Sequence, residues 1–373
     1  MLISFRPYGV ALHPSHPPVS QGFPPMSAFS FDGSPVSVRF WPLTALIGLL
    51  AAAALHPARA APSNADLLTG FGAIVNGNLA AQESEGAELI GGNFVNSGNV
   101  GFNGAPANPP AASLGGYGAI NVYGHTEAGS NTTGRVYVGT ATGNAGGFQN
   151  SSGVTYGYAF PYSFSSLYGQ LSALSSDLSA LAGNSSLLTN TCNGSNCNVI
   201  NAAPQTVRGV AGVAVIDITG AQLATLNTND NGGVRLNGAK LLVVNVDTRD
   251  GVTSFSENYN ATAQGYDSAA IWNFYDATGS LTFSTEFGGT ILATGAAVNA
   301  GNNIDGTIVS GTLNVGSELH YAALNQTGQG FVNGVGGNGS VSNGLPTPVP
   351  EPSSLALLAT GLFGLRLLRR RLA

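Results

Sequence analysis

Residues 289–315 read GTILATGAAVNAGNNIDGTIVSGTLNV. Three short strand-like runs, at 290–292, 304–309 and 312–315, lie among small and turn-forming residues, mainly Gly, Asn and Ala. Short apolar runs between turn residues are typical of short strands joined by tight turns. Such runs can stack as rungs, because each rung buries a small apolar face against its neighbours. The segment therefore predicts a β-solenoid-like arrangement rich in glycine.

The same pattern recurs on both sides of this segment. Runs of three to five residues bounded by Gly, Asn or Ser occur at 73–75, 88–90, 119–123 and 135–138. Two longer runs lie at 213–218 and 240–246, and the second does not alternate at its centre, which predicts burial on both faces. We therefore expect an all-β body over residues 61–327.

The composition excludes several classes of protein. The chain has 373 residues, of which 53 are glycine, 43% are hydrophobic and only 8% are charged. A coiled coil needs more charge, a charge-rich disordered chain has fewer apolar residues, and collagen needs glycine at every third position. Between residues 61 and 350 there are five basic and sixteen acidic residues. This excess of negative charge repels phosphate backbones, so we expect no nucleic-acid partner.

One segment has the period of a helix instead of a strand. Its apolar positions are spaced 4, 3, 4 and 3 apart, at Leu167, Leu171, Leu174, Leu178 and Leu181. This stripe predicts one amphipathic α-helix over about 165–183. Because its opposite face is mostly Ser and Ala, we expect the helix to pack on the body; a short leucine zipper is the alternative.

The N-terminal 60 residues resemble a secretory signal. An apolar run at 42–55 follows Arg39, and Ala58-Arg59-Ala60 has the pattern of a signal-peptidase site, which makes Ala61 the first mature residue. Since 60 residues is long for such a signal, translation is expected to start at Met26. An ordinary buried helix is the alternative.

The C-terminal residues predict a second targeting signal. A Gly/Asn/Ser/Pro-rich linker over 328–349 leads to a short apolar stretch, 355–365, and the arginines after it predict a stop-transfer signal that holds the tail in the inner membrane. The motif residues are Val349, Pro350, Glu351, Pro352, Arg366, Arg369, Arg370 and Arg371.

These tail residues, over 350–373, resemble the PEP-CTERM sorting signal of exported Gram-negative proteins. The resemblance implies recognition by an exosortase and a precursor held transiently in the inner membrane by a short transmembrane helix. Removal of the tail and delivery to the cell surface or extracellular matrix would follow. A plain C-terminal anchor is the alternative.

The body resembles the choice-of-anchor A domain of bacterial surface proteins over residues 65–325. The matching stretches are 241–245, 272–274, 289–293, 305–309 and 318–320. The chain departs from the family at Thr294, where a proline is frequent, and at Ala87, where an arginine is frequent. The resemblance implies a surface or matrix protein, in some cases associated with adhesion, and it offers no catalytic residues.

The two cysteines, Cys192 and Cys197, flank an Asn-Gly turn. In an exported protein an even number of cysteines favours a disulfide. Free thiols remain an alternative, and a metal site is the least favoured, because a lone C-x4-C pair lacks the further ligands that zinc needs.

Oxygen-rich segments suggest calcium as the one candidate cofactor. The candidate ligands Asn229, Asp230 and Asn231 lie in a loop that resembles the start of a calcium loop, but Gly238 stands where a bidentate Glu is needed, so an ordinary turn is favoured. Glu83, Glu85 and Glu88 could gather a cation, although a solvated acidic face is favoured. We therefore expect no cofactor, and calcium is the alternative.

Catalytic groups are sparse, so we expect the protein not to be an enzyme. His125 and Glu127, like Glu318 and His320, are two residues apart and would share one side of a strand. Structural hydrogen bonding is favoured over acid–base or metal chemistry at both pairs. An alternating aromatic stripe is expected to pack under the helix, and stacking on sugars is the alternative; its residues are Tyr156, Tyr158, Phe160, Tyr162 and Phe164.

The sequence thus predicts an exported, non-catalytic, structural or adhesin-like protein that touches matrix polysaccharide or other surface proteins. A binder of ice or polysaccharide surfaces is the second interpretation, and it needs a regular row such as Thr290, Thr307 and Thr312 on one face. A secreted carbohydrate-active enzyme is the third, and it needs two close carboxylates in a cleft.

Overall fold

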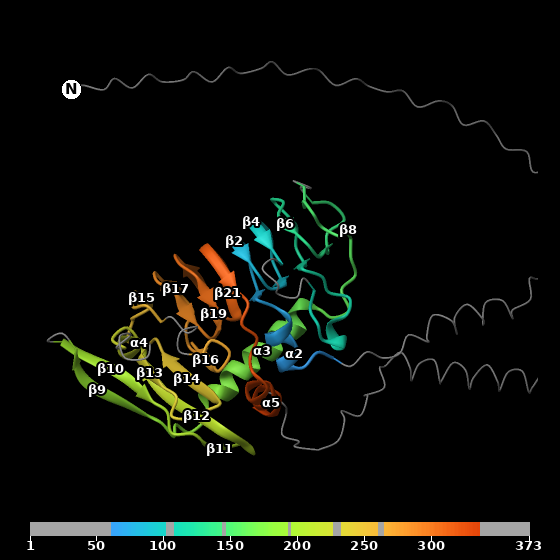
Figure 1. Cartoon of the computed structure of the whole chain (residues 1–373). Coiled ribbons are helices and arrows are strands. Elements are labelled where there is room, and N and C mark those ends of the chain that lie inside the picture. The colour runs from blue at the N-terminus through green and yellow to red at the C-terminus, as the bar shows by residue number, and fades with distance from the viewer. Residues whose placement is uncertain are drawn as a thin grey trace, which may run out of the picture. The chain divides into compact units, whose positions relative to one another are not determined.

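The computed structural model describes residues 61–101, 108–143, 147–192, 195–226, 233–259 and 265–335. The described part is mostly β-structure with few helices (Figure 1). The helices are α2 (Asn64–Gly70), α3 (Phe164–Ser179), α4 (Gly220–Leu223) and α5 (Gln326–Val335), with one 3-10 turn at Ala112–Leu114. None of the helices in these ranges combines the length and the hydropathy needed to cross a bilayer.

The main ladder is a series of hydrogen-bonded parallel strands. In spatial order they are β12 (Val210–Thr219), β14 (Leu241–Asp247), β16 (Ala270–Asn273), the first part of β19 (Thr290–Ala300), the first part of β21 (Ile308–His320), β1 (Ala73–Val75), β3 (Glu88–Ile90), β5 (Ile120–Val122), β7 (Arg135–Val138) and β8 (Gly153–Tyr156). The order is not that of the sequence, because β1 lies between β3 and β21.

A second parallel ladder continues from the same chain segments. It contains β15 (Ser254–Phe255), β17 (Ser280–Phe283), the later parts of β19 and β21, β2 (Leu79–Ser84), β4 (Phe94–Val100) and β6 (Asn131–Thr132). A third, shorter ladder joins β18 (Phe287–Gly288), β20 (Ile304–Asp305) and the end of β21. Long strands such as β21 therefore bridge the ladders and hold them in register.

The remaining strands lie beside β12. Strand β11 (Gln205–Val207) pairs with β12 in antiparallel fashion. A separate sheet contains β9 (Ser186–Cys192), β10 (Ser195–Asn201) and β13 (Val234–Arg235).

Glycine makes the close stacking possible at the corner of the segment 289–315. Gly289 and Gly306 have φ values of 105° and 152°, a region that side chains with a Cβ rarely adopt. A Cβ on Gly306 would collide with the backbone of Gly289 in the neighbouring rung. Glycine at both positions is therefore a steric requirement of the turn.

The main ladder separates two apolar clusters, because side chains of successive strand residues point to opposite faces. Val75, Val244 and Trp272 point into an inner core between the ladders. Ile74 and Val243 point outward into a second core under the helices. Every residue of β14 except Asp247 is buried, which confirms burial on both faces for 241–246, whereas Lys240, the first residue of the predicted run, is exposed.

Helix α3 covers the outer side of the main ladder. It begins after Ser163, whose Oγ accepts a hydrogen bond of 3.2 Å from the backbone N–H of Ser166. The leucine stripe is buried in the outer core against the chain's own strands, which confirms the amphipathic helix and its packing. The helix ends at Ser179, before the predicted end at 183, although Leu181 beyond it is still buried.

Buried amides fasten α3 to the ladder. Asn273 Nδ2 donates to Asn245 Oδ1 (2.9 Å) and to the carbonyl of Ser175 (2.8 Å), and its Oδ1 accepts from Ser175 Oγ (2.6 Å). Asn245 Nδ2 in turn donates to the carbonyl of Leu178 (3.0 Å) and to Asp217 Oδ1 (2.9 Å). We call Asn245 and Asn273 with these hydrogen bonds the amide clip. It fixes the position of α3 along the strands.

Replacing Asn273 by Ala is expected to lower the free energy of unfolding by about 3 kcal/mol, because buried partners lose their hydrogen bonds. Chemical denaturation of the purified protein measures this loss. The matched control is Asn299→Ala, which removes a partly exposed amide from β19 and should cost less than about 1 kcal/mol. Equal losses for the two variants would contradict a special role for the clip.

The first and last described elements are joined to each other. Asn64 Nδ2 donates to the carbonyl of Val332 (3.0 Å), and the backbone N–H of Ala65 donates to Asn333 Oδ1 (2.9 Å). Phe331 and Val335 are buried in the outer core. The packed body therefore extends to Val335, into the segment where the sequence predicts the start of the linker.

Candidate binding surface

The outward side of the second ladder carries aligned hydroxyl and amide side chains. Ser254, Thr282, Asn299 and Asn314 are register partners on four successive strands, and Ser280 and Thr312 lie on the same side, with Ala297 between them. We call these six polar residues the polar face. The alternate residues Leu281, Val298 and Leu313 are buried in the inner core. Parallel pairing spaces the rows by roughly 4.8 Å, so the polar face is regular along the ladder.

A row of hydrogen-bonded amides continues this outward side over β2, β4 and β6. Asn150 Nδ2 donates to Asn131 Oδ1 (2.8 Å), and Asn131 Nδ2 donates to Asn99 Oδ1 (3.0 Å). The row ends where Asn99 Nδ2 donates to Glu83 Oε2 (3.2 Å). These bonds hold the amides in fixed orientations at the surface.

His320 lies between two carboxylates at the end of β21. Its Nδ1 is 2.6 Å from Asp305 Oδ1 and its Nε2 is 2.9 Å from Glu318 Oε2. Burial lowers the pKa of His320, but the hydrogen bonds to Glu318 and Asp305 outweigh burial, so the pKa is raised above its ordinary value. The stabilisation by the protonated ring is therefore lost as the pH rises through the raised pKa. The prediction of structural hydrogen bonding for Glu318 and His320 fits this arrangement.

The three glutamates expected to form one acidic cluster lie in different environments. Glu83 accepts from Asn99 on the outward side, and Glu85 Oε2 accepts from the backbone N–H of Tyr321 (2.9 Å). Glu88 is fully buried. Both predictions for this trio, a shared cation site and a shared solvated face, are wrong, because Glu83 lies on β2 of the second ladder whereas Glu88 lies on β3 of the main ladder and is buried. Within the described ranges no three His, Cys, Asp or Glu side chains are grouped as metal ligands would be.

Glu88 is the buried acid of the inner core. It lies in register with Ala73 and Ile120, and neither of its carboxyl oxygens has a hydrogen-bond partner. Burial raises the pKa of Glu88 to about 8, and the nearby Ser84 hydroxyl lowers it only in part. The carboxyl is therefore uncharged at neutral pH.

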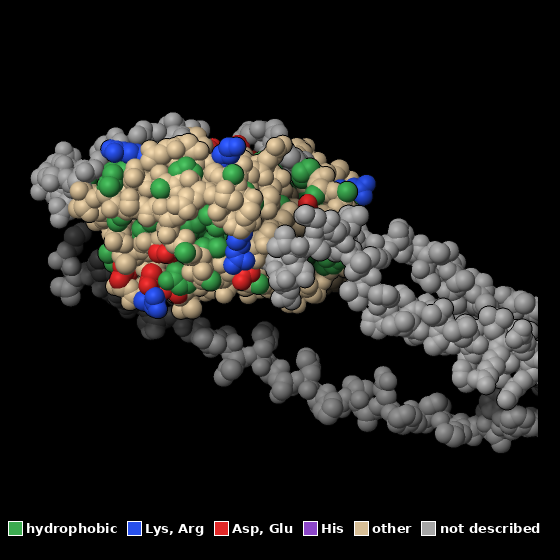
Figure 2. Space-filling view, turned by 90° about the horizontal axis from the view of Figure 1, so that it is seen from below, with side chains coloured by type: hydrophobic (Ala, Val, Ile, Leu, Met, Phe, Trp, Pro, Cys, Tyr) green, Lys and Arg blue, Asp and Glu red, His purple; other side chains and the backbone are tan. Residues whose placement is uncertain are grey.

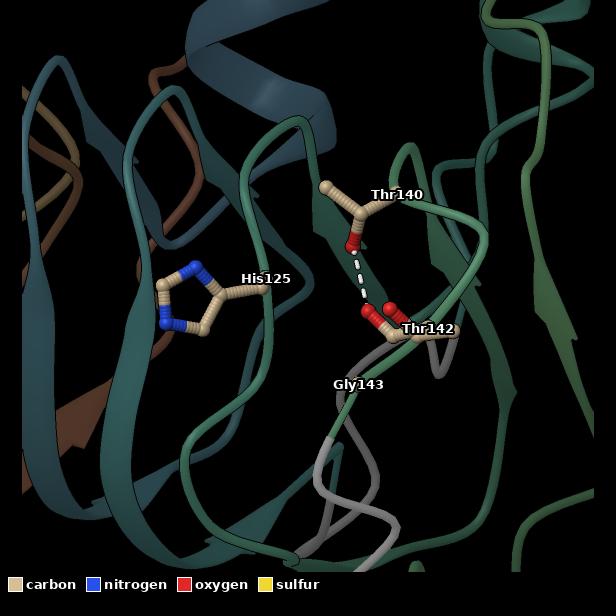
Figure 3. A pocket seen from close by; sticks show the side chains of 4 residues that line it. All are labelled: His125, Thr140, Thr142 and Gly143. Atoms are coloured by element: carbon tan, nitrogen blue, oxygen red, sulfur yellow. Dashed lines mark hydrogen bonds between the residues drawn. The ribbon is translucent and has the colours of Figure 1, made fainter. Parts of the chain in front are cut away.

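A shallow hollow of about 480 Å³ is lined by His125, Thr140, Thr142 and Gly143 (Figure 3). The hydroxyl of Thr140 donates to the carbonyl of Thr142 (2.9 Å), and the imidazole points away from both threonines in this view. His125 Nε2 lies 3.4 Å from Glu127 Oε1, and both side chains are about half exposed. The polar groups of this hollow do not converge on one point, as a catalytic site would require.

The aromatic stripe packs on the body. Tyr158 stacks on Tyr137 with ring centroids 4.1 Å apart, and Phe160 stacks on Tyr123 at 4.0 Å. Phe164 is buried and contacts Tyr123 edge-on at 5.4 Å. These rings therefore pack on the body, and Phe160 and Tyr162 lie against the outer core that α3 shares.

The threonine row suggested by the sequence is wrong. Thr290 and Thr307 are fully buried, and Thr307 Oγ1 donates to the carbonyls of Leu68 (2.9 Å) and Phe71 (3.1 Å). Of the three, Thr312 alone is exposed. Alternation within each short run places Thr282 and Asn314 on one side of its own strand. Only the register between the strands shows that the two residues share the same face of the ladder.

The remaining sequence-predicted sites are tested only in part. The cysteines lie on the antiparallel pair β9 and β10, where Cys192 is the register partner of Ser195 and Cys197 that of Asn190. The described ranges contain no free cysteine, and the Cys192–Cys197 disulfide stays a prediction. Ala61 is the first described residue and is exposed. Outside the described residues lie Ala58, Ala60, Asn229, Asp230, Asn231 and the tail from Val349 to Arg371.

On the face seen in Figure 2, several Asp and Glu side chains gather at the lower left beside a basic side chain, and the other charged side chains are few. This view agrees with the low charge content of the sequence.

Two family comparisons match the chain. Residues 348–371 match the PEP-CTERM protein-sorting motif, which confirms that part of the tail prediction and indicates export, a membrane-anchored precursor, processing by an exosortase and a place at the cell surface. No curated protein and no solved structure matches the chain significantly. Residues 64–321 match the family described as "Putative Ice-binding-like adhesive domain", whereas the choice-of-anchor A family is not specifically shown. The chain belongs to this family of ice-binding-like adhesive domains, and it is an exported, adhesin-like surface protein.

Proposed function

We propose that the exported protein is a non-catalytic adhesin whose polar face binds uncharged polysaccharide of the extracellular matrix. The observation that carries this proposal is the register of Ser254, Thr282, Asn299 and Asn314 along one ladder. Ser and Thr hydroxyls and Asn amides both donate and accept hydrogen bonds, as sugar hydroxyls do. A regular row of such groups can therefore meet a repeating polymer at several points.

Each contact is expected to be weak, and the affinity comes from their number. A polymer chain that holds one residue of the polar face brings further sugar units close to the next rows, which raises their effective concentration. The acidic side chains Glu83 and Glu318 border the row at β2 and β21, where they are register partners. Their charge favours a neutral polysaccharide over an acidic one.

The proposal also includes several predictions made from the sequence about the fold, the source and the processing of the protein. The parallel stacking of short rungs supports a β-solenoid-like body, and the sorting motif supports a Gram-negative cell as its source. A signal peptide over 1–60, the Cys192–Cys197 disulfide and a choice-of-anchor A relationship complete it. The sparse catalytic groups support the absence of enzymatic activity.

Ice is the second candidate ligand, favoured by the description of the matching family. A flat row of hydroxyls also fits an ice surface. The mixed row of Ser, Thr and Asn, with Ala297 inserted, supports a polysaccharide more than a crystal lattice, which demands a strict repeat.

The double variant Thr312→Glu/Asn314→Glu is expected to bind exopolysaccharide from the producing cells at least about 10-fold more weakly, because it adds bulk and charge to the polar face. Sedimentation of the purified exported protein with the polysaccharide measures binding, and an ice-recrystallisation assay runs in parallel. The control is Thr206→Glu, an exposed threonine of β11. Undiminished binding by the double variant contradicts the assignment, ice inhibition without glycan binding selects the second candidate, and polymer cleavage contradicts the non-catalytic role.

A further inference from the structure

The two ends of the main ladder differ in the elements that cover the inner core. At the β12 end, the sheet of β9, β10 and β13 and the short helix α4 cover the inner core. Ile200, Leu223, Leu226 and Val234, from these covering elements, are all buried in that core. At the other end the last strand is β8, and in Figure 1 it lies far from β9 and β10.

At the β8 end a row of the inner core reaches the surface. Ile120, Val136 and Val154 are successive register partners on β5, β7 and β8. The first two are fully buried, whereas Val154 is 36% exposed and is the one large exposed apolar side chain within the described residues. Phe148 and Tyr156 pack against the inner core near this end, but Val154 itself stays partly exposed.

The backbone of β8 also has an open edge. The N–H of Ser152 donates to the carbonyl of Gly134 (3.1 Å), on the β7 side. Because N–H groups of successive strand residues point to opposite edges, those of Gly153 and Thr155 face away from β7. Within the described ranges no strand pairs with this second edge. Unpaired edges of this kind are templates for a further strand.

Strand β8 is short, which is one common protection of an edge strand, but it lacks two others, charge and proline. Proteins commonly block such edges with charged residues or proline. Residues 136–176 contain no charged residue, and β8 itself reads GVTY. In a body with a large excess of acidic residues, this uncharged end is also where two identical copies repel each other least.

We propose that β8 is a self-association surface, at which β8 of one copy pairs in antiparallel fashion with β8 of a second copy. The two-fold arrangement is self-complementary, because each strand offers the same N–H and carbonyl groups to its partner. It joins the two main ladders into one sheet and brings the exposed Val154 side chains of both copies under cover. Arg135, the charged residue nearest to β8 in the sequence, lies on β7, so the two copies of it are roughly 14 Å apart across the junction, beyond the Debye length.

A strand of four residues forms a small interface, so the dimer is expected to be weak and to depend on concentration. Copies held at a cell surface are crowded, which raises the dimer fraction there. Pairing of β8 leaves the polar face free, since that face belongs to the second ladder. This inference is independent of the ligand proposed above.

Sedimentation velocity of the purified exported protein over a 100-fold concentration range is expected to show a monomer–dimer equilibrium. Val154→Lys places a charge on the edge strand, and Thr155→Pro removes an N–H from the open edge alone. Each variant should raise the concentration at half-dimer at least about 10-fold. Thr206→Lys, on β11 at the opposite end, is the matched control and should dimerise like the unaltered chain.

Each possible result of this experiment either supports or overturns the proposed dimer. A monomer at every concentration, unchanged dimerisation of Val154→Lys, or open-ended polymers in place of dimers would overturn the proposal. If Thr155→Pro fails to fold, as judged by circular dichroism, Val154→Lys decides the question, because its side chain lies at the surface. Loss of dimerisation with unchanged polysaccharide binding would support it.

Discussion

A chain that lacks residues 61–76 is expected to lose its cooperative unfolding transition altogether. The deletion removes α2 and β1, although they stand at the start of the body. Strand β1 pairs with β3 on one side and with β21 on the other, in the middle of the main ladder. Its loss splits the ladder and opens both apolar clusters, since Val75 belongs to the inner core and Leu67 to the outer one.

Circular dichroism and thermal denaturation of the purified protein measure this effect. The control is a circular permutant in which residue 335 is linked to residue 61 and the chain is opened between Gly143 and Gly147. This variant keeps β1 and should keep the cooperative transition, because the α2–α5 contacts place the joined ends close together. A truncated chain that melts within a few degrees of the unaltered protein would contradict the central place of β1.

The second large effect is expected from pH, through Glu88. Burial raises the pKa of this carboxyl from 4.5 to about 8, so the folded state holds its proton where the unfolded state has lost it. The stability contributed by the protonated carboxyl is fully present below pH 4.5, is lost as the pH rises from 4.5 to about 8, and does not fall further above that pH. The shift corresponds to a loss of at most about 5 kcal/mol in the free energy of unfolding.

Urea denaturation at pH 5, 7 and 9 tests this expectation with Glu88→Gln, which cannot ionise. The stability of the variant should vary with pH by several kcal/mol less than that of the unaltered protein. Glu257→Gln, at an exposed glutamate, should leave the pH dependence unchanged. Deprotonation of His320 also lowers the stability of the folded state as the pH rises through its raised pKa. The contribution of Glu88 is therefore given by the difference between the Glu88→Gln variant and the unaltered protein. Parallel curves for Glu88→Gln and the unaltered protein would show that the carboxyl is solvated.

Sequence periodicity sufficed for the elements with strong local patterns. The leucine stripe predicted α3, and the unbroken run at 240–246 predicted a strand buried on both faces. Helix α2 carried a signal that was missed, since Ser63 and Asp66 form a capping box. Helix α5 reads QTGQGFVNGV, whose glycines oppose a helix, and it forms because Phe331 and Val332 are buried against the body.

The candidate surface could not be derived in the same way, because it depends on pairing between distant rungs. Thr290 and Thr312 are both threonines in short strand-like runs, yet one is buried and the other exposed. Their positions differ because β19 enters the main ladder at residue 290, whereas β21 has passed into the second ladder by residue 312. Only the register reveals which ladder a residue joins, and therefore whether helices or solvent cover its outer side.

The central position of β21 has a mechanical consequence. A cell-surface adhesin is loaded by flow, and a pull applied to the C-terminal side of this body would first reach α5 and then β21. In an array whose last rung lies at an edge, such a pull peels that rung away by breaking one bond at a time. Here β21 is flanked on one side by β19 and on the other by β1 and β2, so two rows of hydrogen bonds resist together. The fold is thus arranged to resist tension at the end of the chain nearest the sorting signal.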